Sequence, residues 1–275
     1  MTQTVLVPSS LVREADGKRE ATRKIGTVAR AAAIFQVDHV VVFPDPAGED
    51  ALGGRFVETV LAYAATPPYL RKVVWDRRPE LAYAGVLPPL HVGPRTGSGS
   101  TDSGSLRQGI VTEVGSEGRV RVNCGMQHPI SLRVPSDMTV AEGERVTVRV
   151  SSRRPVRARL TDEPSPGYSV TRADLAATLE AADAGLALAT SRHGRPLTRE
   201  RLASLATRIP AAGLTVAFGA PGRGLPEILE IDPSELEADP GPFDCWLNTI
   251  PNQGTETVRT EEAMIASLAV LALTE

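Results

Sequence analysis

The sequence predicts an α/β protein in which a mostly parallel sheet, with helices on both faces, is interrupted by a small inserted β-barrel. Towards both ends of the chain, short apolar runs alternate with helical segments, an order typical of parallel sheets. The middle instead holds five short strand-like runs separated by Gly, Pro, Asp and Glu turns, the spacing expected of a small barrel. A glycine- and serine-rich stretch at residues 93–105 precedes these runs and indicates a flexible entry into the insertion.

The flanking regions supply the elements of the predicted sheet. Their strands are short, mostly apolar runs, as in parallel strands buried on both faces. In chain order we expect a strand at residues 4–7, a helix at 18–36, a strand at 39–43, helices at 55–64 and 171–182, a strand at 186–189, a helix at 198–208, strands at 214–218 and 243–247, and a helix at 262–273. The last two strands each lead into a glycine- and proline-rich loop. Ligands bind beyond the carboxyl ends of strands in such sheets, so these loops predict a ligand site.

The insertion is predicted to form five strands with a basic outer face. They lie at residues 107–114, 119–124, 130–134, 145–150 and 155–160. In the second and fourth, polar residues alternate with valine, which places arginines on one face and valines in the core. A five-stranded OB-like barrel often binds single-stranded nucleic acid. We therefore expect RNA to bind at Arg119, Arg121, Arg145 and Arg149; the alternative is a strand face in contact with solvent only.

The charge of the chain changes at the same place. Residues 91–160 contain 11 arginines, no lysine and six acidic residues, a formal charge of +5, whereas the whole chain carries −3. A GC-rich genome explains the excess of arginine over lysine as well as a function does, but the uneven placement indicates a surface suited to phosphate. We assign residues 1–92 and 164–275 to the two parts of the α/β domain and residues 93–163 to the barrel.

Composition and motifs exclude several classes of protein. The chain has neither an apolar run of about 18 residues, which a membrane helix needs, nor a basic-then-apolar signal sequence at its start. We expect a soluble, cytoplasmic protein. Two distant cysteines and four scattered histidines predict no disulfide framework and no metal site. The glycine fingerprint of dinucleotide-binding folds and the lysine-containing phosphate loop are both absent, which disfavours NAD and nucleoside triphosphate chemistry.

The two C-terminal loops carry the strongest pattern in the chain. They read GAPGRGL at residues 219–225 and NTIPNQGTETVRTEEA at residues 248–263. A pocket shaped by glycine and proline, without a phosphate grip, suits a compact nucleoside held by backbone groups.

With four further segments, these loops resemble the SPOUT class of RNA methyltransferases, in its archaeal and eukaryotic branch with an inserted OB-like domain. The segments are KIGTVARAAAIFQVD at residues 24–38, PPYLRK at 67–72, YAGVLPPL at 83–90 and TSR at 190–192. The resemblance implies a trefoil knot in the C-terminal chain, S-adenosylmethionine as cofactor and a homodimer. The final helix is apolar around much of its circumference, which fits either a dimer contact or burial within one chain.

The resemblance also assigns site residues. It implies that the cofactor is bound by Thr190, Gly219, Pro221, Gly224, Leu225, Asn248, Ile250, Gln253, Gly254 and Thr257. Glycines let the backbone approach a ligand, and Leu225 and Ile250 would sandwich the adenine. Arg259 and Glu262 are the candidate catalytic residues. The alternative for Glu262 is structural, because acidic residues at a helix start interact favourably with the positive helix end.

These observations predict an S-adenosylmethionine-dependent RNA methyltransferase. By family analogy the reaction is base methylation of ribosomal RNA, with uridine N3 as the favoured acceptor. Methyl transfer from a sulfonium depends chiefly on alignment of donor and acceptor, so no strong general base is required. Two alternatives remain: a non-catalytic RNA-binding ribosome-assembly factor that keeps the fold, and a protein methyltransferase.

Overall fold

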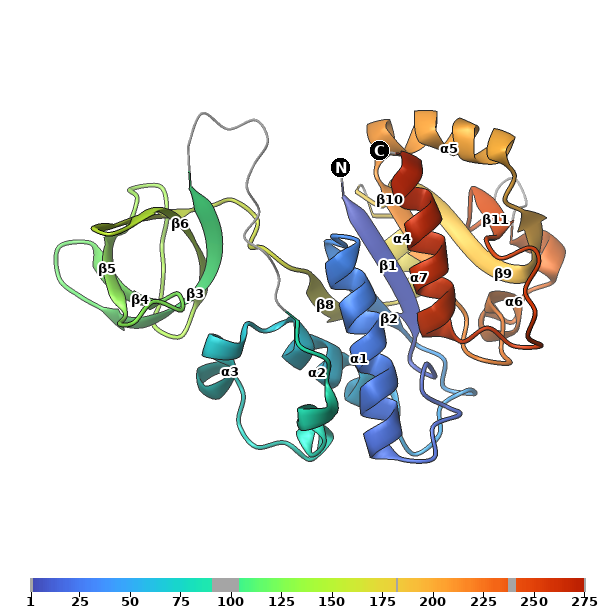
Figure 1. Cartoon of the computed structure of the whole chain (residues 1–275), viewed down its shortest axis with the longest axis horizontal. Helices are drawn as coiled ribbons and strands as arrows, with labels where there is room; N and C mark the ends of the chain where they lie inside the picture. Colours follow the sequence, from blue (N-terminus) through green and yellow to red (C-terminus); the bar gives the residue numbers. More distant parts are fainter. Residues whose placement is uncertain (1, 91–103, 182, 237–240, 275) are drawn as a thin grey trace. The chain divides into compact units, whose positions relative to one another are not determined.

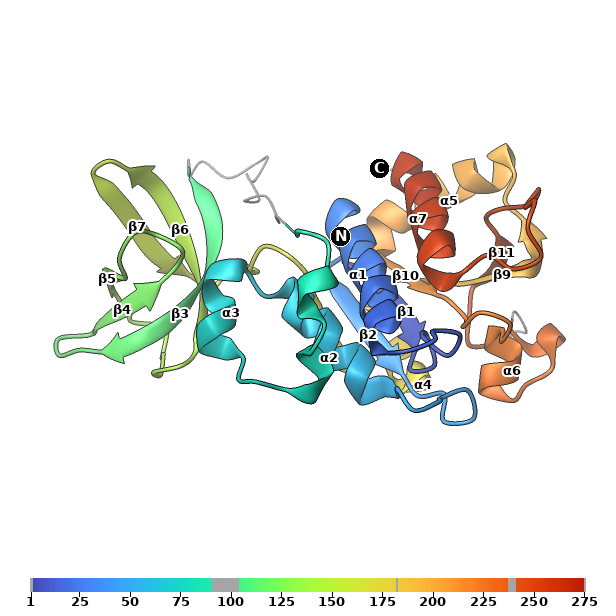
Figure 2. The ribbon, with the colours of Figure 1, turned by 60° about the horizontal axis from the view of Figure 1, so that its bottom comes forward.

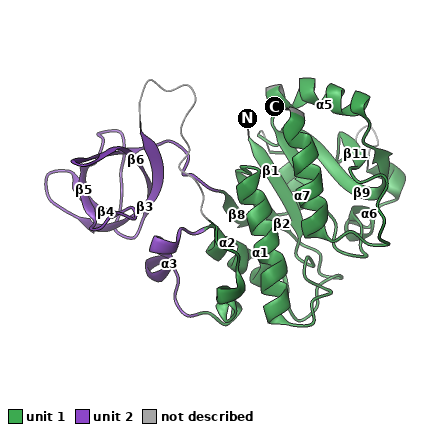
Figure 3. Cartoon of the chain, in the orientation of Figure 1, with its two compact units in different colours: residues 1–65, 78–90, 168–275 green, residues 66–77, 91–167 purple. Residues whose placement is uncertain are grey.

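A computed structural model describes residues 2–90, 104–181, 183–236 and 241–274. The chain divides into two compact units (Figure 3). The α/β unit comprises Met1–Ala65, Arg78–Leu90 and Tyr168–Glu275, and the barrel unit comprises Thr66–Arg77 and His91–Gly167. Most of the glycine- and serine-rich stretch predicted at residues 93–105 lies outside the described residues. In the part of the chain that is described, no helix is long and apolar enough to span a membrane.

The α/β unit is built on a six-stranded sheet, and every neighbouring pair of its strands is parallel (Figure 1). The strand order is β11-β9-β10-β1-β2-β8. In that order the strands span Cys245–Asn248, Leu186–Pro196, Leu214–Ala217, Gln3–Pro8, His39–Phe43 and Ser169–Arg172. The predicted mostly parallel sheet is therefore confirmed.

Helices cover both faces of this sheet. One face carries α1 (Lys18–Ile34), α2 (Gly54–Ala65), α5 (Arg199–Ala212) and α7 (Thr260–Leu271), and the other carries the short α4 (Leu175–Leu179) and α6 (Leu225–Leu229). Side chains of β1 alternate between the two cores, with Val5 and Val7 in the first and Leu6 in the second, as the twofold period of a strand requires. Helices α1 and α7 lie side by side on the sheet (Figures 1 and 2).

The predicted helix at residues 171–182 is wrong over its first part. Residues 169–172 form strand β8, which extends the sheet by pairing with β2. Helix α4 begins only after Asp174, whose carboxylate accepts a hydrogen bond from the Ala176 amide at 2.9 Å. An N-cap of this kind fixes where a helix starts, and β-branched Val170 and Thr171 favour the extended backbone before it.

The barrel unit is a nearly closed antiparallel sheet in the order β5-β4-β3-β6-β7. Its strands β3 to β7 span, in chain order, Ser105–Val114, Arg119–Asn123, Ile130–Arg133, Arg145–Arg153 and Val156–Thr161. All five predicted strands are present, and valines of β4 and β6 fill the core of this unit. Cys124 is buried in the same core, and neither it nor the partly buried Cys245 forms a disulfide.

A helix that precedes the insertion in the sequence belongs to the barrel unit. This helix, α3 (Pro68–Val74), brings the Tyr69 hydroxyl to the carbonyl oxygen of Gln108 on β3, to which it donates at 2.8 Å. The Tyr69 ring also lies over Gly125, where an added Cβ would be 2.8 Å from the ring. Burial raises the pKa of Tyr69 to about 12, so the hydroxyl stays protonated and keeps its hydrogen bond.

The expectation of an exposed basic face is wrong at Arg149. Its side chain is buried and forms an ion pair with Glu163, with Nε and Oε1 2.9 Å apart. The reason is the segment at residues 163–166, which crosses this face of the sheet. Ser165 hydrogen-bonds Thr147 of β6, and the carbonyl of Pro166 accepts from Gln108 of β3. By contrast, Arg119, Arg121 and Arg145 are exposed, as predicted.

Candidate active-site cavity

A cavity of about 810 Å³ lies in the α/β unit beyond the carboxyl ends of β10 and β11, beside the middle of β9. It is lined by three segments of the C-terminal chain, and the two loops identified in the sequence supply two of them. The lining residues are Thr190, Ser191, Arg192, His193, Phe218, Gly219, Ala220, Gly222, Arg223, Gly224, Pro226, Glu227, Pro233, Trp246, Asn248, Thr249, Ile250, Gln253, Glu256, Thr257, Val258, Thr260 and Ala263.

The first wall is an excursion in the middle of β9. The pairing of β9 with β11 jumps from Ala189 opposite Trp246 to Arg195 opposite Leu247, so residues 190–194 lie outside the regular register. Thr190 closes the start of the excursion, because its buried hydroxyl donates to the carbonyl oxygen of Ala217 at 2.8 Å. The excursion places three successive polar residues at the cavity: Ser191, Arg192 and His193.

The excursion ends at Gly194, where the backbones of β9 and β11 nearly touch. A Cβ at this position would lie 2.6 Å from the carbonyl carbon of Leu247 and 2.9 Å from the Asn248 amide nitrogen. Only glycine allows so close an approach of two backbones. The residue therefore fixes how β9 rejoins its neighbour after it has lined the cavity.

The second wall is the turn at residues 219–224. Gly222 has φ +67°, which favours glycine, and a Cβ at Gly219 would lie 2.8 Å from the carbonyl oxygen of Arg223. The turn is attached to the start of α7, because the Thr260 hydroxyl donates to the Gly219 carbonyl at 2.7 Å. Glycine thus permits the tight turn, and Thr260 holds it in place.

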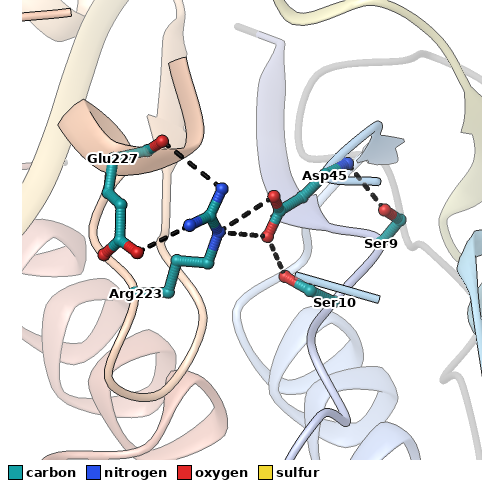
Figure 4. A network of polar contacts seen from close by, with 5 residues as sticks. All are labelled: Ser9, Ser10, Asp45, Arg223 and Glu227. Atoms are coloured by element: carbon teal, nitrogen blue, oxygen red, sulfur yellow. Dashed lines mark hydrogen bonds and ion pairs between the residues drawn. The ribbon is translucent and has the colours of Figure 1, made fainter. Parts of the chain in front are cut away.

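A polar network fastens the same turn to the N-terminal half of the chain (Figure 4). The Nε of Arg223 lies 3.0 and 3.1 Å from the two carboxylate oxygens of Asp45, which follows β2. The Asp45 side chain is 1% exposed, accepts a short hydrogen bond from the Ser10 hydroxyl, and its amide donates to the Ser9 hydroxyl at 2.7 Å. Arg223 also pairs with Glu227 at 2.6 Å. Arg223 therefore attaches this wall of the cavity both to the residue that follows β2, Asp45, and to Glu227 of α6.

The third wall is the loop that follows β11. Asn248 joins it to the β9 excursion: its Nδ2 donates to the carbonyl of Arg192 at 2.9 Å, and its Oδ1 accepts from the Ile250 amide at 3.0 Å. Gln253 donates within the loop, to the carbonyl oxygen of Thr255 at 2.8 Å and to that of Glu256 at 3.2 Å. Asn248 and Gln253 thus shape the wall, and their contact with the cofactor stays a prediction.

Seven of the ten predicted cofactor residues line the cavity: Thr190, Gly219, Gly224, Asn248, Ile250, Gln253 and Thr257. Pro221 and Gly254 are not among its lining residues, and neither is Leu225. Leu225 is fully buried in the core beneath α6 instead. Of the two residues expected to sandwich the adenine, Ile250 lines the cavity and Leu225 does not, so the sandwich stays a prediction.

The two candidate catalytic residues also lie outside the lining. The Glu262 carboxylate accepts a hydrogen bond from the Arg259 amide at 2.9 Å, which caps the start of α7. The Arg259 guanidinium lies 3.5 Å from Glu14. These contacts support the structural alternative for Glu262, since a residue at this position satisfies a free amide of the first helical turn.

A buried carboxylate, Glu261, lies next to them. It is 6% exposed, and burial raises its pKa, although Lys24 acts in the opposite direction. Within the described residues its Oε2 has no hydrogen-bond partner. Lys24 is itself buried and pairs with Glu14 at 3.0 Å. The start of α7 therefore holds a compact charged cluster that the sequence did not predict.

The lining of the cavity combines apolar surface with charged side chains of both signs. Trp246, Ile250 and Val258 offer apolar contact, and the charged residues are Arg192, Arg223, Glu227 and Glu256, of which Arg223 and Glu227 pair with each other. Ligand pockets of about 300–1,000 Å³ with apolar walls and a few polar groups hold drug-sized molecules, so the cavity has room for a ligand of nucleoside size. Among the residues that the structure describes, no group of three His, Cys, Asp or Glu side chains could hold a metal ion.

Comparison with known proteins identifies the family. Residues 2–271 match the family described as "Putative RNA methyltransferase". The chain belongs to this family of RNA methyltransferases. It is 65% identical over 283 residues to an uncharacterized protein of Halobacterium salinarum, with all of both chains covered. It is also 31% identical over 309 residues to the 28S rRNA (uridine-N(3))-methyltransferase of Homo sapiens, covering 98% of this chain and 77% of the human protein.

In this RNA methyltransferase, sequence reasoning missed part of the cavity. The TSR segment at residues 190–192 indicated only its first residue as a contact, yet Arg192 and His193 also line the cavity. Arg192 further donates to the carbonyl oxygen of Glu256 at 2.9 Å. The available signal was the polar run at residues 190–193, directly after the apolar strand predicted at 186–189. That run did not show that β9 continues to Pro196.

Proposed function

We propose that this protein methylates ribosomal RNA on a base nitrogen, with uridine N3 as the acceptor and S-adenosylmethionine as the donor. The observation that carries the proposal is the cavity of about 810 Å³, into which three separate segments bring residues that the family resemblance indicated for this cofactor. The human relative named for 28S rRNA uridine-N3 methylation, aligned over 98% of the chain, supports the choice of acceptor.

The residues present fit S-adenosylmethionine. When bound, it supplies a methyl group carried on a positively charged sulfonium. Ile250 and Val258 give apolar surface for its base, and the carboxylate of Glu256 suits a positive charge, whereas Glu227 is paired with Arg223. The turn at Gly219 brings main-chain groups to the cavity without a side chain in the way.

As the S–CH3 bond breaks and the N3–CH3 bond forms, the proton of uridine N3 leaves to water. The main part of the chain in this reaction is to hold and align donor and acceptor. Effective alignment of reacting groups alone contributes about 7–11 kcal/mol to catalysis. Three non-covalent contacts set the shape of the cavity. They are the hydrogen bonds of Asn248 with Arg192 and of Thr260 with Gly219, and the ion pair of Arg223 with Asp45. Arg259 and Glu262 stay candidate catalytic residues, and their contacts at the start of α7 support a structural part for Glu262.

Three further features complete the proposal. The C-terminal chain would form the trefoil knot of the SPOUT class, and the protein would act as a homodimer. Ile265 and Leu273, 40% and 74% exposed on α7 and the turn after it, give the dimer an apolar contact surface. Arg119, Arg121 and Arg145 would bind RNA on the barrel, where they are exposed.

The test is transfer of labelled methyl groups from S-adenosylmethionine to ribosomal RNA that lacks its own modification. We expect transfer by the natural protein and at least a tenfold loss in a Gly219→Val variant, because the new side chain would meet the Arg223 carbonyl. Calorimetry on the natural protein separates the alternatives. Cofactor binding without transfer to any RNA would favour a protein substrate, and absence of cofactor binding would favour a non-catalytic assembly factor.

A further inference from the structure

A second, smaller cavity lies in the α/β unit between α5 and the strands β9 and β11. Its volume is about 190 Å³, and three arginines line it: Arg195, Arg201 and Arg208. A single acidic residue, Asp244, lies among its lining residues. Three guanidinium groups around one small cavity form an anion-binding arrangement, since arginine presents a planar fork that matches phosphate.

The surrounding sequence is strongly basic. Residues 191–208 contain five arginines and one acidic residue, a formal charge of +4 in a chain that carries −3. The predicted basic region ended at residue 160, so this second concentration of arginines was not part of the predicted RNA-binding face. A local positive potential of this kind attracts polyanions even when the whole protein is acidic.

The structure holds Arg201 and Arg208 in place without using up their donors. Arg201 donates to the carbonyl oxygen of Pro196, and Arg208 lies 3.2 Å from Asp244. Asp244 is itself fixed, because its other oxygen accepts from the Ala187 amide at 2.8 Å. A guanidinium has five N–H donors, so donors of Arg201 and Arg208 remain for a ligand. Both ends of the Arg208–Asp244 pair are about half exposed, which leaves the pair open to a competing phosphate.

Strand β9 connects this surface with the methyltransfer cavity. Arg192 lines the large cavity and Arg195 lines the small one, three residues further along β9 and just after the end of the excursion. An enzyme that modifies a base takes the nucleotide out of its stack, and contacts with the neighbouring phosphates fix its position. The order of the two cavities along β9 suits an RNA strand that places its target base in the large cavity. The phosphate backbone of that RNA would continue past the small cavity.

We propose that Arg195, Arg201 and Arg208 bind the phosphate backbone of the RNA next to the target nucleotide. This inference rests on the proposed function, because it takes the large cavity as the place of the target base. It adds an RNA-binding surface on the α/β unit itself, separate from the arginines of the barrel. The contacts would be with phosphate, so they would position the RNA without reading its sequence.

The test compares two double variants that remove the same charge. Arg195→Gln with Arg201→Gln alters the proposed surface, and Arg19→Gln with Arg23→Gln alters two exposed arginines of α1. RNA affinity is measured over a range of salt concentrations, and cofactor affinity by calorimetry. We expect the first variant to bind RNA about 5- to 50-fold more weakly at 0.1 M salt and to lower the salt slope by about 1.5. The α1 variant should match the natural protein in both.

Two further measurements keep the inference falsifiable. A charge-preserving variant, Arg195→Lys with Arg201→Lys, should recover most of the salt slope, since lysine keeps the charge but not the fork. Unchanged cofactor affinity shows that the variants are folded. Equal RNA affinity and salt slope in the glutamine variant and the α1 control would overturn the inference, even if the natural protein methylates RNA. If no RNA is methylated at all, the proposed function fails, while the binding comparison still decides whether this surface contacts RNA.

Discussion

Replacing Asp45 by asparagine tests whether the wall of the cavity depends on a residue far from it in the sequence. Asp45 is 1% exposed and receives the Arg223 guanidinium, whose side chain is 11% exposed. The change keeps the size of the side chain and part of its hydrogen bonding but removes its charge. Of its two carboxylate partners, Arg223 would then keep only Glu227, which is 57% exposed.

The structure sets the expected size of the effect. Breaking a buried ion pair by removing one partner costs about 3–5 kcal/mol. Asparagine still accepts hydrogen bonds, and Arg223 keeps Glu227, so we expect the free energy of unfolding to fall by about 2–3 kcal/mol. If the turn at residues 219–224 becomes disordered, binding of S-adenosylmethionine must order it again. A cost of about 1.4 kcal/mol for this ordering lowers the affinity about tenfold.

The assay pairs chemical denaturation with calorimetric titration of S-adenosylmethionine. The matched control is Asp38→Asn, which removes the charge of a carboxylate that accepts the Gln3 amide at 2.9 Å, just before the amino end of β2. We expect the control to lose about 1 kcal/mol of stability and to bind the cofactor as the natural protein does. Lost stability with unchanged affinity in Asp45→Asn would refute the idea that this network positions the cavity wall.

Three further predictions concern single contacts. Thr260→Val should lower cofactor affinity about fivefold in calorimetry, because it removes the hydrogen bond of about 1 kcal/mol that holds the Gly219 carbonyl; an unchanged affinity would mean that the turn keeps its shape unaided. The pKa of Glu163 is lowered by its hydrogen bonds from Arg149 and Thr161. Its contribution should therefore be present above the ordinary pKa of glutamate and be lost as the pH falls through the lowered value, and Glu163→Gln should flatten this acid dependence in denaturation series. Burial raises the pKa of Glu261, so its charged form opposes folding. Glu261→Gln should not lower the unfolding free energy at neutral pH, and a clear loss there would show that Lys24 depends on the charge of Glu261.

Much of the fold could be predicted because local patterns decide it. The five barrel strands follow from the alternation of polar and apolar residues. A shift of one residue in a strand would turn its valines from the core to the solvent. The region at 169–172 was misjudged because a four-residue strand has too few positions to show a period. Arg149 was predicted to be exposed because alternation shows which residues of a strand lie on the same face of the sheet. Alternation does not show that residues 163–166 cover that face at Arg149.

The site was predictable where loops follow strands and less so where a helix begins. Glycines and polar residues directly after β10 and β11 do line the cavity. Leu225, Arg259 and Glu262 stand at the first turns of α6 and α7, where one residue of register decides between the cavity, the core and a capping contact. The excursion of β9 could not be read from the sequence, because it depends on the close approach of Gly194 to another strand.

The chain passes from one compact unit to the other four times, since Thr66–Arg77 and His91–Gly167 are both enclosed by segments of the α/β unit. The barrel is consequently not a cassette bounded by a single entry and exit. A fragment cut from residues 104–167 would leave Tyr69 behind and uncover the surface around Gly125 that its ring protects. Grafting this barrel onto another protein, or exchanging it between relatives, requires both pieces to be moved together.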